Sequence, residues 1–295
     1  MVTDAQWVDL DKNGFEDLVI TGNWMGIKIF KNNRGKFNSD NRLDQYKGWW
    51  SSLEVADVDG DGDLDIIGGN LGLNSKFKAS VKEPMKIYIK DFDNNGTKEC
   101  VTSIFKNDGN EYVFHLRQDL VGQLPSFKKR FLKYEDYAGK EFNKVFTDDL
   151  IEGAETHQIV DLQSAVFINE GDNKPFLHKP FPYQAQLSSV NVILCNDIDN
   201  DGTMEIILGG NFYGFKPEVG RLDASYGQVY QLNNKRFTYF SPKQTGLNLS
   251  GQVRSALIIK NARSNKTFLF GKNNAPLAAY QINPAMPKKI LANGN

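Results

Sequence analysis

The chain contains 295 residues, with a formal net charge of -1 at pH 7, 40% hydrophobic residues and 26 glycines. This balance of charge gives no strong field that would favour nucleic acid or an anionic membrane, and no run of about 18 apolar residues could span a bilayer. The composition predicts a globular, turn-rich protein of one large domain or two average ones.

The N-terminal residues enter a repeating pattern almost at once. Met1–Asp4 lack the charged and apolar regions of a secretory signal peptide, and Trp7-Val8 already have the character of a strand. We therefore expect a chain that begins inside a larger architecture, and this start says little about the cellular compartment.

The first unit, from about Ala5 to about Phe37, predicts four short strands. One strand ends at Leu10, a second covers Asp17–Thr21, and a third, Ile27–Phe30, shows the alternation with period two that is typical of strands. A hairpin turn at Asn32–Gly35 leads into the fourth strand.

An acidic loop joins the first two strands, and its spacing recurs three more times. Acidic residues or asparagine occupy loop positions one, three, five and nine, glycine occupies position six, and position seven offers its backbone carbonyl. The candidate metal ligands are Asp9, Asp11, Asn13 and Asp17; Asp57, Asp59, Asp61, Asp63 and Asp65; Asp91, Asp93, Asn95, Thr97 and Glu99; and Asp197, Asp199, Asp201, Thr203 and Glu205. The second loop, with the most carboxylates, is the strongest candidate, and the third is the weakest.

The crowded carboxylates of these loops favour a bound hard cation. Calcium takes six to eight oxygen ligands from carboxylates, carbonyls and water, whereas unpaired carboxylates at this spacing would repel one another. A single loop could also be a solvated turn, since Asp, Asn and Gly are ordinary turn residues, but four copies in one register favour metal. An EF-hand is excluded because position twelve is Ile20, Gly68, Thr102 or Leu208 and the flanks are strand-like.

The later units repeat the arrangement of strands at intervals typical of propellers and arrays, about 20–50 residues. The predicted strands are Trp49–Val55 and Leu64–Gly68 in the second unit; Met85–Ile89 in the third; Val190–Leu194, Met204–Gly209 and Gly227–Leu232 in the fourth; and Val253–Lys260, Thr267–Gly271 and Leu277–Gln281 in the last. Four short strands per unit favour a β-propeller of four-stranded blades. About five units are visible.

The interval between the third and fourth loops is too long for one blade. Between residues 116 and 154, apolar residues recur at steps of three and four among charged ones, and Pro125 can end one helix and begin the next. We interpret this segment as two or three short helices inserted in a single propeller domain that covers residues 1–295. Their aromatic residues are expected to pack on the blades. Strand character returns at 155–161 and 164–169.

A long loop, residues 211–226, interrupts the fourth unit and is rich in glycine and aromatic residues. Long loops in compact folds are often functional, and exposed aromatic side chains stack on sugars or anchor protein partners. The candidate ligand-binding residues are Trp24, Trp49, Trp50, Tyr213, Arg221 and Tyr226. The alternative is that these side chains fill the core between blades.

The four acidic loops, with the turns Thr21-Gly22-Asn23, Gly68-Gly69-Asn70 and Gly209-Gly210-Asn211, resemble bacterial FG-GAP/VCBS repeat proteins, which share their calcium loop with integrin α-subunit propellers. The resemblance implies a seven-bladed propeller, structural calcium in each acidic loop, and an extracytoplasmic site at the cell surface, in the periplasm or in secreted form. Because only about five units are visible, the chain is expected to be the C-terminal part of a larger surface protein.

Signals for catalysis are weak. His115, His157 and His178 show no zinc-ligand spacing, and no nucleophile elbow, P-loop or dinucleotide motif is present. We therefore expect a calcium-binding surface module for protein or glycan rather than an enzyme. The alternative is a propeller that frames a polysaccharide-cleaving site. Cys100 and Cys195 are expected to be small buried residues rather than a disulfide.

Overall fold

The structure is a computed structural model, and it describes residues 1–171, 174–260 and 266–281. The chain forms two compact units. The first comprises residues 1–45, 49–76 and the described residues from 162 onward, and the second comprises residues 46–48 and 77–161. The fold is mostly β, as the sequence predicts, and the strands of each sheet other than β5 pair antiparallel.

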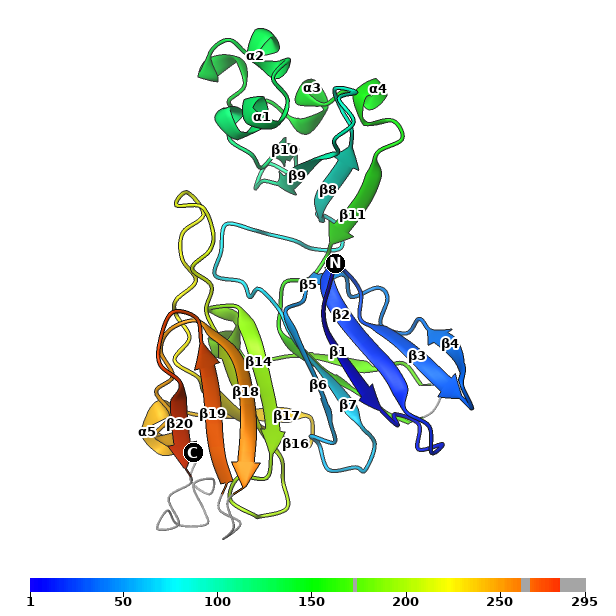
Figure 1. The fold of residues 1–295 in the computed structure, drawn as a ribbon, viewed down its shortest axis with the longest axis vertical. Helices are drawn as coiled ribbons and strands as arrows, with labels where there is room; N and C mark the ends of the chain where they lie inside the picture. Colours follow the sequence, from blue (N-terminus) through cyan, green and yellow to red (C-terminus); the bar gives the residue numbers. More distant parts are fainter. Residues whose placement is uncertain (172–173, 261–265, 282–295) are drawn as a thin grey trace. The chain divides into compact units, whose positions relative to one another are not determined.

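The first unit contains four successive sheets (Figure 1). In sheets 1, 3 and 4 each strand pairs with the next along the chain, whereas in sheet 2 the strand β7 pairs with β12. Sheet 1 contains β1 (Val2–Val8), β2 (Asp17–Met25), β3 (Lys28–Asn33) and β4 (Lys36–Asp40), and the short β5 (Gly48–Trp49) also pairs with β2. Sheet 2 contains β6 (Ser52–Ala56), β7 (Asp65–Gly69), β12 (Ala165–Ile168) and β13 (Leu177–Pro180). Sheet 3 contains β14 (Val190–Asn196), β15 (Glu205–Gly210), β16 (Gln228–Asn233) and β17 (Arg236–Phe240). Sheet 4 contains β18 (Val253–Lys260), β19 (Lys266–Lys272) and β20 (Ala278–Gln281).

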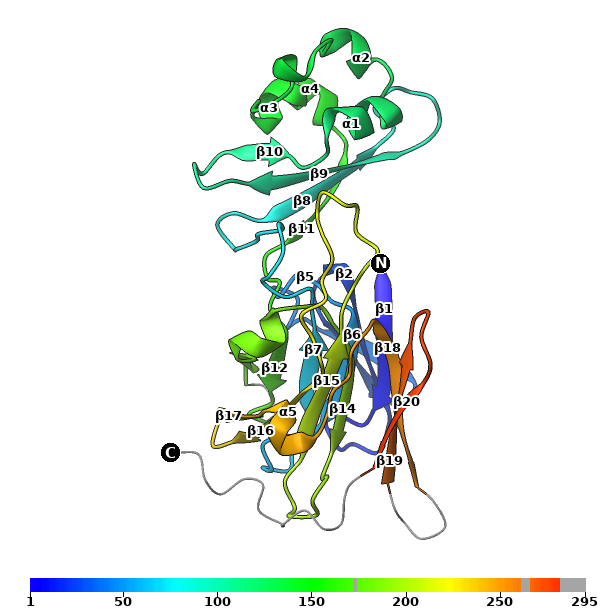
Figure 2. The same ribbon diagram turned by 90° about the vertical axis from the view of Figure 1, so that its left-hand side faces the viewer.

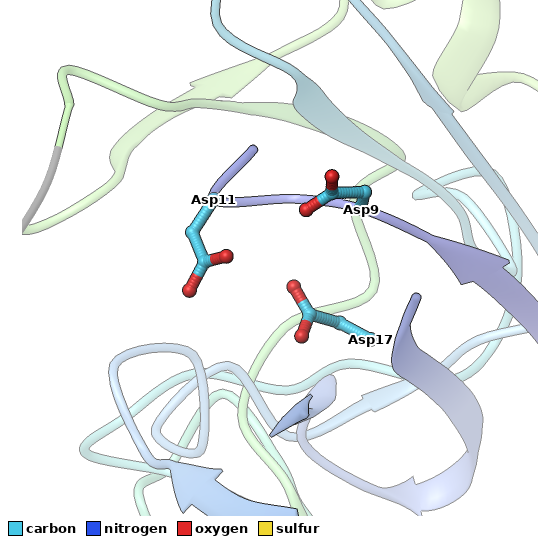
Figure 3. Close-up of side chains that lie close together, drawn as sticks. All are labelled: Asp9, Asp11 and Asp17. Carbon is cyan, nitrogen blue, oxygen red and sulfur yellow. The ribbon is translucent and has the colours of Figure 1, made fainter. Parts of the chain in front are cut away.

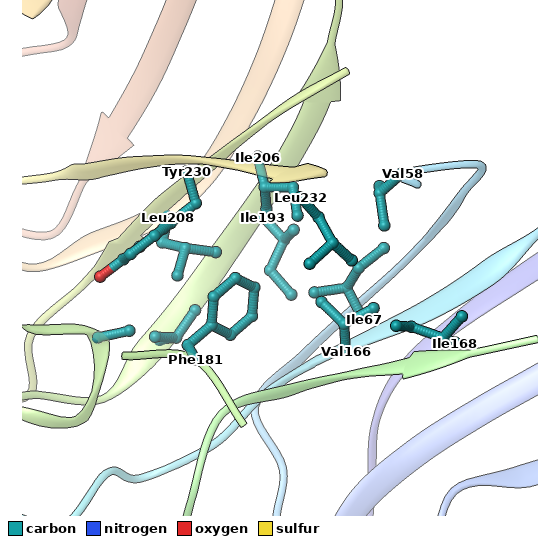
Figure 4. Packing of buried hydrophobic residues seen from close by; sticks show 12 residues of the cluster. Val58, Ile67, Val166, Ile168, Phe181, Ile193, Ile206, Leu208, Tyr230 and Leu232 are labelled. Carbon is teal, nitrogen blue, oxygen red and sulfur yellow. The ribbon is translucent and has the colours of Figure 1, made fainter. Parts of the chain in front are cut away.

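The first strands of these sheets, β1, β6, β14 and β18, are neighbours in that order. Two short helices connect the sheets along the chain. The 3₁₀ helix η2 (Tyr183–Gln186) follows sheet 2 and precedes sheet 3, and α5 (Pro242–Thr245) follows sheet 3 and precedes sheet 4. Apolar side chains fill the space between consecutive sheets. Figure 4 shows the cluster in which Ile67 and Val166 of sheet 2 meet Ile206 and Tyr230 of sheet 3. Burial of these side chains is the main force that holds the sheets together.

The second unit has a sheet and helices of its own (Figure 2). Its strands lie in the order β10 (Glu111–Val113), β9 (Glu99–Phe105), β8 (Met85–Lys90) and β11 (Glu155–Ile159). Its helices are α1 (Arg117–Gln123), α2 (Phe127–Arg130), η1 (Tyr134–Asp136), α3 (Phe142–Val145) and α4 (Asp148–Ile151). Tyr88, Phe92 and Val101 of the strand region pack with Leu120, Phe142 and other helical residues in one buried cluster.

Three details differ from the expectations. The inserted segment contains four short α-helices and one 3₁₀ helix instead of two or three helices. Its aromatic side chains pack on the sheet of the second unit rather than on a sheet of the first. Cys100 is an exposed free thiol rather than a buried one, whereas both cysteines lack a disulfide, as expected.

The strands around residue 160 also belong to different sheets than the sequence suggests. The expected strand at 155–161 forms β11 and pairs with β8 of the third repeat, whereas the strand at 164–169 forms β12 and pairs with β7 of the second repeat. The second unit is therefore an insertion between two adjacent strands of sheet 2. The two chain segments that flank this insertion are joined by a hydrogen bond 2.8 Å long, from the backbone N–H of Gly72 to the carbonyl of Leu162.

Candidate metal centres and aromatic loops

The three acidic loops of the first unit lie at one end of its sheets. Each follows the first strand of its sheet, whereas Asn70 and Asn211 follow the second strands β7 and β15 at the other end, and Gly22-Asn23 lies within β2 (Figure 1). The remaining acidic loop, the third in chain order, begins at Asp91, belongs to the second unit and joins β8 to β9.

The carboxylate at position one shapes each loop by accepting two backbone N–H groups of the same loop. Asp9 accepts from Asn13 and Gly14, at 2.9 and 2.8 Å. Asp91 and Asp197 accept from their own positions five and six in the same way. Asp57 accepts from positions four and six. The side chain at position five in turn accepts the N–H of position seven in all four loops. The sequence thus preforms the loop through local hydrogen bonds.

The carboxylate at position nine is buried and ties each loop to the strand that follows it. It accepts the backbone N–H of position two in every loop, at distances from 2.7 to 3.1 Å. In the first two loops, its other oxygen accepts a backbone N–H from the third strand of the sheet. Asp17 accepts from Asn32, and Asp65 accepts from Asn169. Position nine therefore links the loop to its sheet.

The carboxylates converge at one point in each loop. Figure 3 shows Asp9, Asp11 and Asp17 directed toward one another, and one oxygen of each lies within 4.8 Å of the others. The equivalent positions one, three and nine converge in the third and fourth loops, as Asp91, Asp93 and Glu99, and as Asp197, Asp199 and Glu205. In the second loop the converging groups are instead Asp57, Asp59 and Asp61, while the Asp63 side chain forms an ion pair with Lys12.

Two unsatisfied atoms are consistent with a site that could hold a cation, although the Lys31 ammonium already lies 3.6 Å from Oδ2 of Asp11. Oδ1 of Asp11 and Oδ1 of Asp93, both at position three, are buried and have no hydrogen-bond partner. An unpartnered carboxylate oxygen among other carboxylates is costly unless a positive charge lies nearby. The oxygen-only donor sets match the preference of calcium.

The pKa values of several loop carboxyl groups lie above their ordinary values. Burial is the main cause that raises the pKa of Asp65 and of Glu205 to about 7; the neighbouring acids of the same loop add to it, and the backbone hydrogen bonds to these carboxylates oppose it. Burial is also the main cause that raises the pKa of Asp17, Asp59 and Asp199. A divalent cation among these oxygens would favour the ionised forms, so metal binding would release protons near neutral pH.

At the opposite end of the first unit, two tryptophans of sheet 1 and two phenylalanines of the loop after β15 form a continuous strip with an arginine of sheet 4. Trp24 lies 6.0 Å from Trp49, and Trp49 lies 6.0 Å from Phe215, measured between ring centroids. Phe215 contacts Phe212 at 4.6 Å, and the guanidinium of Arg254 lies 5.1 Å from the Phe212 ring. The four rings of the strip are half-buried, and Arg254 is exposed.

The other predicted ligand-binding residues are divided between surface and core. Arg221 lies over the Tyr213 ring at 4.9 Å, on the strand-like ribbon in which Phe212 pairs with Leu222. Tyr226 is 53% exposed. Trp50 is 0% exposed and packs edge-on against Phe167, so it belongs to the core and its prediction as a ligand-binding residue is wrong.

Buried asparagines hold the strip in place. Asn70 and Asn211, the last residues of two Gly-Asn turns, are 0% and 1% exposed. The Asn70 side chain accepts the backbone N–H of Trp49, which places that tryptophan in the strip. Gly210 precedes Asn211 at a point where a Cβ would lie 1.6 Å from the Ser189 carbonyl, so only glycine fits there. Trp24 has φ of 65°, a left-handed conformation that is costly for a bulky side chain and that often marks functional sites.

Sequence reasoning missed three members of the strip: Phe212, Phe215 and Arg254. The two phenylalanines lie in the loop that was singled out, and its run of aromatic residues was the available signal. Arg254 follows the first residue of β18, and only the packing of sheet 4 on sheet 3 brings it to the Phe212 ring.

Comparison with known proteins supports the repeat. A family model for the FG-GAP-like repeat matches residues 9–68, which extend from the first acidic loop through the second and into β7. No curated protein matches the chain. No helix among the described residues is long and apolar enough to cross a membrane. In residues 9–68 the chain is therefore similar to an FG-GAP-like repeat.

Proposed function

We propose that the chain is a calcium-stabilised β-propeller module that binds a protein or a glycan through the aromatic strip from Trp24 to Arg254. The continuous strip is the observation that carries this proposal. Aromatic faces stack on sugar rings and anchor protein partners, and rigid sheets hold these rings in fixed positions. The resemblance to FG-GAP/VCBS repeat proteins supports a place at a bacterial cell surface, within a larger protein.

The arrangement of the sheets supports the propeller. In a propeller the first strand of each blade lies beside the first strands of its neighbours, and β1, β6, β14 and β18 are neighbours in this order. Each sheet also meanders outward from its first strand. The sheets of the first unit are proposed to be four blades, and the second unit is proposed to be an insertion in the second blade.

Calcium would be held by the converging carboxylates, with the strongest candidate ligands at positions one and three of each loop. The ion would supply positive charge that lets these buried acids ionise together, and it would link the two strands that each loop joins. The orphaned oxygens of Asp11 and Asp93 support this role. The proposed role is structural, since the ligand strip lies at the other end of the sheets.

Thermal unfolding with and without calcium tests the metal. A ligand that binds only the folded state stabilises it, by about 2.7 kcal/mol when its free concentration is one hundred times its Kd. Addition of calcium after chelation should therefore raise Tm, whereas magnesium at the same concentration should raise it less. An unchanged Tm after chelation and re-addition would remove calcium from the proposal.

A glycan array and a pull-down with immobilised protein would test the strip. Trp24→Ala and Trp49→Ala should each abolish capture of whatever the native protein retains. Tyr134→Ala is the matched control, because this tyrosine is an exposed aromatic residue of the second unit. Ligand capture that survives both tryptophan substitutions would place the binding surface elsewhere.

The enzyme alternative would need a carboxylate pair outside the acidic loops. Glu54 on β6 and Asp4 on β1 form such a pair, and burial raises the pKa of Glu54 to about 7. Both oxygens of Asp4 already accept backbone N–H groups, from Ala5 and Leu53. We therefore favour binding over catalysis. Polysaccharide cleavage that is lost in Glu54→Gln would reverse this preference.

A further inference from the structure

In each sheet of the first unit that has an acidic loop, one residue of the third strand lies directly opposite position nine of that loop. Cross-strand neighbours project to the same face of a sheet, so the side chain of this residue shares a face with the buried carboxylate. The residue is Lys31 in sheet 1, Ile168 in sheet 2 and Gln231 in sheet 3. Lysine is the only one of the three that carries a charge.

The Lys31 ammonium lies among the carboxylates of the first loop. Its Nζ is 3.6 Å from Oδ2 of Asp11, and the two side chains are 28% and 19% exposed. Burial raises the pKa of Asp17, and the positive charge of Lys31 opposes that rise. Asp11 and Asp17 both belong to the converging group shown in Figure 3. The protein thus supplies a positive charge of its own to the first loop.

The charge of Lys31 also affects Asp40 on β4, but that carboxylate has a stronger partner. The Arg42 guanidinium donates to Oδ2 of Asp40 from Nη2 and from Nε, at 2.7 and 2.9 Å. Asp40 therefore keeps a positive partner when Lys31 is changed, and such a change acts mainly on the acidic loop.

Lysines near the other two loops of the first unit contact groups that do not converge. Lys12 pairs with Asp63, Lys235 pairs with Glu170, and Lys266 donates to the Asn196 side chain and the Asp197 carbonyl. Among the described residues, no ammonium forms an ion pair with a converging carboxylate of the second or fourth loop. In sheet 3 the neutral Gln231 amide occupies the place of Lys31 and donates to Glu205 at 3.2 Å.

We propose that Lys31 is the built-in counter-ion of the first acidic loop, so that this loop is stable without metal and binds calcium more weakly than the second and fourth loops do. A divalent cation and an ammonium in one cluster repel each other, so calcium would have to displace the lysine. The comparison between loops rests on the proposed function, whereas the role of the ammonium in the first loop needs no metal.

Thermal unfolding followed by tryptophan fluorescence tests the proposal, because all four tryptophans belong to the first unit. Lys31→Met removes the charge and keeps the apolar stem. In chelator it should lower Tm by about 2–4 °C, the shift expected for one partly buried ion pair in a unit of this size. In excess calcium its Tm should return to the native value, since the loop then accepts the ion. Lys31→Arg retains the charge and should behave like the native chain.

Lys28→Met is the matched control. Lys28 lies on the same strand, β3, and pairs with Asp44, a carboxylate outside the acidic loops. The two side chains are 32% and 33% exposed, so this ion pair is partly buried like that of Lys31. The loss of Tm in Lys28→Met should therefore be the same in chelator and in calcium.

The results separate this inference from the calcium proposal. If calcium raises the Tm of the native chain but Lys31→Met loses no stability in chelator, or keeps its deficit in calcium as Lys28→Met does, the role of Lys31 is overturned and the calcium proposal stands. A calcium response in Lys31→Met but not in the native chain would support the role of Lys31 and remove calcium from the second and fourth loops. No response in either protein would refute both.

Discussion

Replacement of Asn211 by alanine should destabilise the first unit more than any surface substitution. The buried side chain makes four hydrogen bonds. Its Oδ1 accepts from the Ser188 hydroxyl and the Ser225 N–H, both at 2.9 Å, and its Nδ2 donates to the carbonyls of Ser225 and Gly251, at 2.8 and 2.9 Å. Each net contribution is about 1 kcal/mol, and the partners that remain are buried without replacements.

The backbone of Asn211 adds to the cost. Its φ of 81° lies in the left-handed region, which asparagine tolerates better than alanine does, and the difference is about 1 kcal/mol. We therefore expect Asn211→Ala to lower the free energy of unfolding by about 5 kcal/mol. For a unit of this size, each 1 kcal/mol corresponds to about 2–4 °C, so Tm should fall by about 10–20 °C. Urea denaturation followed by tryptophan fluorescence would measure the change.

Two control variants separate the contributions. Asn211→Gly removes the side-chain hydrogen bonds, but glycine adopts a positive φ without strain. It should therefore lower the free energy of unfolding by about 1 kcal/mol less than Asn211→Ala does. Asn234→Ala alters an exposed asparagine with φ of 48° and should cost only the backbone contribution, about 1 kcal/mol. If Asn211→Ala costs no more than Asn234→Ala, the asparagine does not hold the loop, and the reasoning about the Gly-Asn turns is refuted.

Three further outcomes are expected. Asp59→Ala should reduce the calcium-induced rise in Tm more than Asp93→Ala does, because the second loop has the most carboxylates; equal reductions, measured by calorimetry, would contradict this ranking. The pKa of Glu54 is about 7 in the folded state, against an ordinary value of 4.5. The carboxyl group therefore stays protonated to higher pH in the folded state than in the unfolded state. The free energy of unfolding should consequently fall by about 3 kcal/mol as pH rises from about 4.5 through 7. Glu54→Gln should flatten this decline in urea titrations between pH 4 and 8, and parallel curves for the two proteins would disprove the link. Excision of residues 77–161, with a short glycine-serine linker between Lys76 and Leu162, should leave a cooperative unfolding transition, since the Gly72–Leu162 hydrogen bond already brings the two chain segments together; a molten product by near-ultraviolet circular dichroism would show that sheet 2 needs the insertion.

Local features of the fold were predictable because they depend on local chemistry. The spacing of each acidic loop placed a carboxylate at position one, where it accepts two N–H groups of its own loop, and another at position nine, where it accepts the N–H of position two. All of these partners lie within seven residues. A pattern of nine residues therefore contains enough information to define the turn.

Side-chain direction was less predictable. Trp49 and Trp50 are adjacent and extended, so they point to opposite sides of the backbone. One of them had to face the core and the other had to face away, but the sequence alone does not show which. The packing of Trp50 on Phe167, a residue of the third strand of sheet 2, decides it.

The number of acidic loops also differs from the number of such loops in the sheets of the first unit, because one loop belongs to the second unit. Such a loop requires only two consecutive antiparallel strands, and the third loop has these in β8 and β9. Which sheet the two strands join depends on the strands that follow. Here β10 pairs with β9 and β11 pairs with β8, while β12 returns to β7 over an interval of nearly one hundred residues. The acidic loop therefore marks a connection between strands rather than a blade. A chain with four such loops can have three of them in one stack of sheets and the fourth in a unit that interrupts it.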